Sequence, residues 1–156
     1  MRQFFLILGI LLPFVVAAQK KTVAVQLKTE EDFDKSTMEA FRDILQESIH
    51  NSKMYKIVAR QDDMDMIQQE AVFNMNASDS EIVKWGEAVG ADCVAFVNIK
   101  KVISNYQISC KLFEANSSQN LLFIGSTRTK QGKEDLEDAL DYISKEMFSA
   151  KVDYKR

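Results

Sequence analysis

The sequence predicts an α/β domain with a five-stranded mixed sheet and packed helices, in the order β-α-β-α-α-β-β-β-α. Three observations predict this fold. Short runs of β-branched and alternating apolar residues are typical of strands. Segments with apolar residues at helical spacing separate the first three of these runs. Polar turns alone separate the last three runs, which are therefore expected to form hairpins.

The elements follow one another with recognisable start signals. Strands are expected at residues 21–27, 55–59, 93–99, 106–113 and 121–129. Helices are expected after capping-box patterns at Ser36 and Ser78, over a short stretch near 62–71, and after Gly132. Helical crossovers make the first three strands parallel neighbours, whereas the hairpins make the last three strands antiparallel.

Pairing in the first hairpin determines where the two cysteines lie. If Ile103 faces Tyr106, Cys93 and Cys110 are about six residues apart along the ladder, roughly 20 Å at the usual rise per residue. A disulfide needs Cα atoms within about 7 Å of each other. We therefore expect two buried free thiols rather than a disulfide.

The same pairing divides the strand residues between two faces of the sheet. One face is apolar and predicts a dry core, made of Cys93, Ala95, Val97, Ile99, Ile108, Cys110 and Leu112. The other face is half polar, and a matching turn at 116–120 would set Phe123 beside Phe113 and complete an aromatic row with Phe96. Two interpretations of this row remain open: a second core covered by a helix, or a patch that docks a protein partner.

The N-terminal segment, residues 1–18, has the pattern of a signal peptide. Arg2 precedes an apolar run, Pro13 interrupts it, and small residues precede an expected cleavage between Ala18 and Gln19. The alternative is an uncleaved transmembrane anchor, which needs about 20 apolar residues. The apolar stretch at 4–18 is somewhat short for that. The pattern therefore favours a cleaved signal peptide.

Residues 19–156 are expected to form a single α/β domain with a short charged tail at its C-terminus. No stretch rich in proline, glycine or serine divides this part of the chain. The chain is 46% hydrophobic and 28% charged, as in folded globular proteins. No cysteine lies near Ala18, so a lipid anchor of the bacterial lipoprotein kind is not expected at the usual place.

The composition and motifs exclude several classes of function. A net charge of −3 gives no basic footprint for nucleic acid. His50 is the only histidine, and no histidine–cysteine cluster has the spacing of a zinc site. The acidic runs at 32–34 and 62–65 lack the glycine and the distal glutamate of a calcium loop. Glycine-rich phosphate loops and nucleophile motifs are also missing. We therefore expect no catalysis, no metal and no cofactor.

Four segments of the chain together resemble one family of periplasmic domains. They are an opening strand at 21–25, a strand with Arg60 followed by Glu70, a Gly-Ala-Asp entry to a strand at 86–94, and a hairpin at 106–126. In order and spacing they resemble the curli-channel (CsgG-like) and penicillin-binding-protein-activator (LpoB-like) domains, which are similar to the N-terminal domain of TolB. The family's Thr-Gly is missing from the hairpin turn. The resemblance implies a non-enzymatic envelope protein that works by protein–protein contact, with Arg60 and Glu70 in structural roles.

These observations give one leading hypothesis and two alternatives. The leading hypothesis is an exported periplasmic adaptor or accessory domain in cell-envelope assembly, with or without association to the outer membrane. It would bind a protein partner through a sheet edge or through the row of Phe96, Phe113 and Phe123. The first alternative is a subunit of a ring- or channel-like outer-membrane secretion assembly, which would be a homo-oligomer. The second is a periplasmic domain that binds a small ligand between helices and sheet.

Overall fold

The computed structural model describes residues 19–58, 78–115 and 120–149. In chain order the elements are β1 (Lys21–Thr29), α1 (Lys35–Asn51), β2 (Tyr55–Ile57), α3 (Asp79–Ala88), β3 (Cys93–Val102), β4 (Asn105–Glu114), β5 (Leu121–Arg128) and α4 (Leu136–Ser149). The predicted signal peptide, the short helix near 62–71, Arg60, Glu70 and the C-terminal tail lie outside the described residues.

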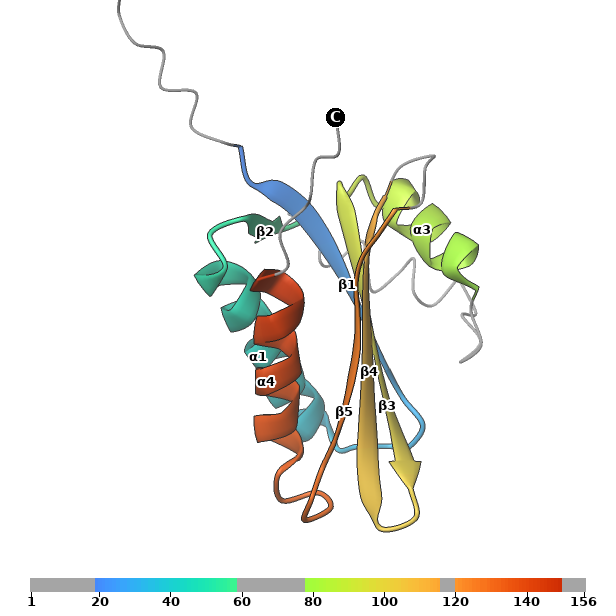
Figure 1. Ribbon diagram of the computed structural model, residues 1–156, viewed down its shortest axis with the longest axis vertical. Helices are drawn as coiled ribbons and strands as arrows, with labels where there is room; N and C mark the ends of the chain where they lie inside the picture. Colours follow the sequence, from blue (N-terminus) through green and yellow to red (C-terminus); the bar gives the residue numbers. More distant parts are fainter. Residues whose placement is uncertain (1–18, 59–77, 116–119, 150–156) are drawn as a thin grey trace, which may run out of the picture.

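The strands form one five-stranded sheet in the order β2-β1-β3-β4-β5. β1 runs parallel to both β2 and β3, while β3, β4 and β5 form antiparallel hairpins. Helices α1 and α4 lie side by side on one face of the sheet, and α3 lies on the other face (Figure 1). This arrangement confirms the predicted α/β fold with a mixed sheet. None of the described helices is long and apolar enough to cross a membrane.

The main core lies between the sheet and the helices α1 and α4. All seven residues of the predicted dry face are at most 1% exposed. They pack against helix residues that recur at helical spacing, including Phe41 and Leu45 of α1 and Leu140 and Met147 of α4. The hydroxyls of Ser48 and Ser144 share a hydrogen bond of 2.7 Å, which satisfies both buried groups where the two helices meet. Full burial of each large apolar side chain contributes about 1.5–3 kcal/mol.

The first hairpin is two residues out of the predicted register. Val102 faces Asn105, so Ile103 and Ser104 form the turn, and Ile103 has a φ of 61°. A shift of two residues leaves every side chain on its predicted face, because side chains alternate with a period of two. Cys93 and Cys110 therefore stay on the core face, four residues apart along β3, as buried free thiols.

The two long crossover helices begin at different kinds of cap. Ser78 and Glu81 form the predicted capping box, in which the Ser78 N–H donates to Glu81 Oε2 at 2.7 Å. The capping box predicted at Ser36 is wrong. Asp34 is the N-cap of α1 and accepts from the Thr37 N–H at 2.9 Å, while the Ser36 hydroxyl donates to the same carboxylate. A carboxylate at the N-cap interacts with both the free N–H groups and the helix dipole.

Candidate functional site

The predicted aromatic row does not form in the structure. Phe96 and Phe113 are 8% and 2% exposed and belong to a second core with Trp85 of α3. Phe123 lies on the opposite face, where it packs against the main core. Of the two interpretations left open by the sequence, the helix-covered core therefore holds for Phe96 and Phe113. The three residues do not make one surface.

A β-bulge explains why Phe123 changes face. The pairing of β4 with β5 shifts between Leu112 and Phe113, so Phe123 faces Leu112 and Phe113 faces Leu121. One extra residue in β5 reverses the faces of the residues beyond it. The Phe123 ring then covers Gly125: a Cβ added there would lie 2.7 Å from Phe123 Cζ.

The close approach of α3 to the sheet explains the burial of the other two phenylalanines. A Cβ added at Gly86 would lie 3.0 Å from the Cβ of Val94 and 3.1 Å from that of Ala115. The helix backbone therefore sits directly on the ends of β3 and β4, and Ile82 and Trp85 complete the second core. This packing against α3 buries the apolar end of the half-polar face, so that end does not form a docking surface.

β5 is an edge strand whose residues are all partly or fully exposed. β5 is the last strand of the sheet, so no described strand pairs with its outer side. Leu121 and Ile124 are 47% and 64% exposed, which makes them two of the four large exposed apolar side chains among the described residues. We call Leu121–Arg128 with its unpaired backbone groups the β5 edge. It is a surface of the kind that pairs with added strands.

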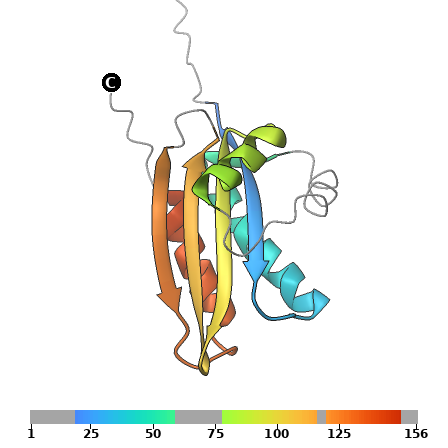
Figure 2. The ribbon, with the colours of Figure 1, turned by 90° about the vertical axis from the view of Figure 1, so that its right-hand side faces the viewer.

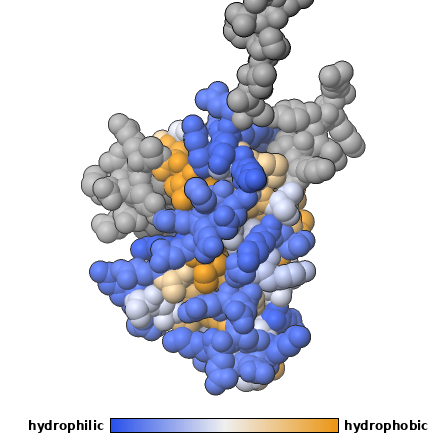
Figure 3. All heavy atoms as spheres, turned by 90° about the vertical axis from the view of Figure 1, so that its left-hand side faces the viewer, coloured by the Kyte–Doolittle hydropathy of each residue, from blue (hydrophilic) through white to orange (hydrophobic). Residues whose placement is uncertain are grey.

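A polar and basic surface adjoins the β5 edge on the α3 side of the sheet. It consists of Lys100, Gln107, Ser109, Lys111, Ser126 and Arg128, which we call the basic sheet face. On this side of the sheet, no described helix lies over the lower halves of β3, β4 and β5 (Figure 2), and all six side chains are partly or fully exposed. Lys111 donates to Asp79 of α3 at 2.7 Å. Lys100 and Arg128 form no ion pair with a carboxylate of the described residues. Hydrophilic side chains cover most of the opposite side of the molecule, over α1 and α4 (Figure 3).

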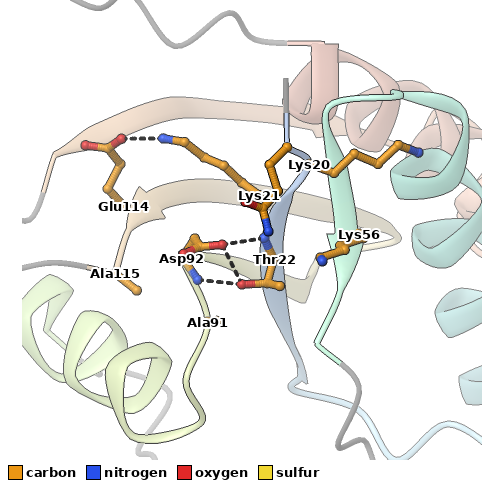
Figure 4. A pocket seen from close by; sticks show the side chains of 9 residues that line it. Lys20, Lys21, Thr22, Lys56, Ala91, Asp92, Glu114 and Ala115 are labelled. Carbon is orange, nitrogen blue, oxygen red and sulfur yellow. Dashed lines mark hydrogen bonds and ion pairs between the residues drawn. The ribbon is translucent and has the colours of Figure 1, made fainter. Parts of the chain in front are cut away.

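A polar pocket of about 410 Å³ lies at the other end of the sheet, where β1 and β3 begin. Asp92 accepts from the backbone N–H and the hydroxyl of Thr22, both at 2.7 Å, and Lys21 pairs with Glu114 at 2.7 Å (Figure 4). The Thr22 bonds hold the pKa of the Asp92 carboxyl below its ordinary value. Asp92 thus joins the start of β3 to its neighbour β1, and Glu114 joins β4 to β1 across β3. The small-ligand alternative would use this pocket, which Lys56 also lines.

Both cysteines are buried, and the single histidine lies at the surface. Burial raises the pKa of Cys93 to about 11 and that of Cys110 to about 12, so neither is a thiolate at neutral pH. His50 is exposed in the last turn of α1. Within the described part of the chain, no three His, Cys, Asp or Glu side chains are grouped to hold a metal ion. Gln19 lines the polar pocket, whereas Ala18 lies outside the described residues.

Comparisons with known proteins show the fold. No family model matches the sequence, and no curated protein matches it significantly. The C-terminal domain of LpoB from Salmonella enterica matches at 14% identity with a TM-score of 0.50, over 75% of this chain and 87% of that one. TolB from Acinetobacter baumannii matches at 14% identity with a TM-score of 0.54, over 85% of this chain but only 28% of TolB. The protein therefore has an α/β fold of the kind found in the LpoB C-terminal domain. The LpoB-like and TolB-like parts of the expected resemblance agree with this fold, and the CsgG-like part stays a prediction.

Proposed function

We propose that the protein is a non-enzymatic accessory protein of the cell envelope, which binds a protein partner at the β5 edge. The observation that carries the proposal is the β5 edge itself, where Leu121 and Ile124 are exposed beside unpaired backbone. The fold similarity to an LpoB domain and the sequence resemblance to penicillin-binding-protein activators support the envelope setting. Pairing of strand backbones supplies affinity without any catalytic group.

Site-specific photo-crosslinking in living cells tests this function. A photoreactive residue replaces Leu121 at the β5 edge, or Arg42 on the exposed side of α1 as a matched control. We expect a discrete adduct with an envelope protein from position 121 and none from position 42. The variant Ile124→Pro should remove the adduct, because a proline on an edge strand disfavours strand pairing. If no surface position gives an adduct with an envelope protein, the proposed function is wrong.

We also propose that the protein is exported to the periplasm and cleaved between Ala18 and Gln19. The support is the signal-peptide pattern of residues 1–18. Intact-mass spectrometry of the protein from its own host should give a chain that begins at Gln19. A mass that includes residues 1–18, found in the membrane fraction, would instead support the uncleaved anchor.

A further inference from the structure

We propose that the β5 edge accepts an extended strand of the partner, and that this strand directs acidic side chains toward the basic sheet face. The inference deepens the proposed function and rests on it, because it specifies how the partner binds. It combines three features of the described residues: the direction of the β5 backbone groups, the lack of protection along the edge, and the charge of the adjoining face.

The backbone of β5 has regularly spaced groups for an added strand. The Thr129 N–H donates to the Tyr106 carbonyl oxygen at 2.9 Å, so these two residues form a hydrogen-bonded pair. Antiparallel neighbours alternate between bonded and non-bonded pairs. Ile124, Ser126 and Arg128 therefore direct their N–H and C=O groups away from β4. An incoming strand can bond to all three residues.

Beyond its β-bulge, the β5 edge lacks the usual devices that prevent strand addition. Natural edge strands carry proline, lysine, inward-pointing charges or β-bulges, or are very short. In β5 the bulge lies between Leu121 and Phe123, so the stretch from Phe123 to Arg128 is regular. β5 has eight residues, none is proline, and its single charge is Arg128 at the end. The opposite edge strand, β2, has only three residues. The exposure of Ile124 on this regular stretch, with Leu121 exposed just before the bulge, favours binding of another chain.

The basic sheet face determines the chemistry of the incoming strand. Residues of that strand opposite Ile124, Ser126 and Arg128 place their side chains on the same face as these residues. Lys100, Gln107 and Arg128 lie in one row across the strands, and Lys111 lies opposite Ile124. None of the described strand residues that face this side is acidic. Acidic side chains on the partner therefore find complementary charge.

The other side of the incoming strand meets apolar groups. Its alternate residues lie beside Phe123 and Thr127 on the α4 side of the sheet, where Ile143 of α4 approaches Gly125. This side lacks charged residues within β5. A partner strand that alternates acidic and apolar residues matches both sides. Such a pattern is a recognisable signature in a candidate partner.

Hydrogen exchange on the full-length protein purified from its host tests the binding mode. The probe is a short synthetic peptide that alternates valine and glutamate, and the comparison is the same peptide with lysine in place of glutamate. In the free protein, the amides of Ile124, Ser126 and Arg128 should exchange fast. The glutamate peptide should slow them, and the lysine peptide should bind at least about tenfold more weakly, with the difference shrinking at high salt. Equal binding of the two peptides, or no slowing at these amides, would overturn the proposal.

Two variants separate backbone pairing from charge. Ser126→Pro removes an outward N–H and should weaken the glutamate peptide about tenfold or more, while the amides of β4 remain protected. The double variant Lys100→Glu with Arg128→Glu keeps the backbone and should reverse the preference toward the lysine peptide. Arg42→Glu on α1 is the matched charge control and should change neither. Wild-type binding by Ser126→Pro, or an unchanged preference in the double variant, contradicts the inference.

The results also distinguish this inference from the proposed function and from self-association. Crosslinks from positions outside β5, with none from position 121, would leave an accessory protein but overturn strand addition. Light scattering that shows a dimer abolished by Ser126→Pro would make a second copy of this chain the occupant, which also overturns it. Peptide binding without any envelope crosslink would contradict the proposed function instead.

Discussion

Replacing Asp92 with alanine should lower the free energy of unfolding by about 2 kcal/mol, because it removes hydrogen bonds to a charged group. The Asp92 carboxylate joins the start of β3 to the start of β1 through two bonds of 2.7 Å from Thr22. Hydrogen bonds to a charged group each contribute about 1.5–3 kcal/mol, so two give at least about 3 kcal/mol. Asp92 is exposed, and water replaces part of what the alanine variant loses, which brings the net loss to about 2 kcal/mol. The melting temperature should fall by roughly 6 °C.

Thermal and urea unfolding of wild type and Asp92→Ala measure this loss, with Asp43→Ala as the matched control. Asp43 is exposed on α1, and alanine there should cost nothing because it favours helix. The bonds from Thr22 lower the pKa of Asp92, so its contribution is complete above the unfolded pKa of about 4. It is lost as the pH falls through the lower, folded pKa. The difference between wild type and Asp92→Ala should therefore shrink in strong acid.

A double-mutant cycle with Thr22→Val gives the decisive comparison. Valine keeps the shape of Thr22 and removes the hydroxyl that donates to the carboxylate and accepts from the Asp92 N–H at 2.9 Å. We expect a coupling free energy of about 1 kcal/mol between the two positions. If the losses of unfolding free energy in the two single variants simply add in the double variant, the Asp92–Thr22 contact does not hold the start of β3 against β1. A loss below about 0.5 kcal/mol in Asp92→Ala would lead to the same conclusion.

Other predictions concern the hairpin tip, the α3 contact and the two thiols. Ile103 is 93% exposed with a φ of 61°, so Ile103→Asn should stabilise the protein by about 1 kcal/mol in urea unfolding; no gain would contradict backbone strain. Gly86→Leu should cost about 2 kcal/mol by the same assay, and a neutral effect would contradict close packing on Val94. Cys93 and Cys110 should resist a thiol reagent at about pH 8 until denaturant is added. Fast labelling of the folded protein would show an open core.

Local chemistry made much of the fold predictable. The apolar alternation of β3 and β4 placed seven residues on the core face, and all seven are buried. The hairpin turn lies one residue before the predicted one, which shifts the register by two residues. Ser104 and Asn105 have ordinary turn chemistry, whereas the turn consists of Ile103 and Ser104. The period of two kept the faces correct despite that error. At α1, the expected cap was Ser36, but Asp34, two residues earlier, is the N-cap because its carboxylate also accepts from a free helix N–H.

The candidate site was less predictable because a single extra residue decides it. Phe123 looks equivalent to Phe113 in the sequence, yet the bulge beside Phe113 moves Phe123 to the opposite face. No distinctive residue type marks the bulge in β5, so the sequence pattern does not predict it. Gly86 of α3 is a signal in the sequence that the prediction did not use. A glycine within a helical pattern indicates close backbone approach, and that approach buries Phe96 and Phe113.

The β5 edge could not be predicted from the sequence, for a physical reason. Its main binding groups are the N–H and C=O groups of β5, which every residue except proline possesses. Whether they are free depends on strand order: β3 uses both of its sides, while β5 uses one. The charge of the basic sheet face can be recognised only from the strand pairing, which brings Lys100 and Arg128, 28 positions apart in the chain, into one row. Specificity at this edge must therefore come from side chains of the basic sheet face, because the backbone alone accepts any strand.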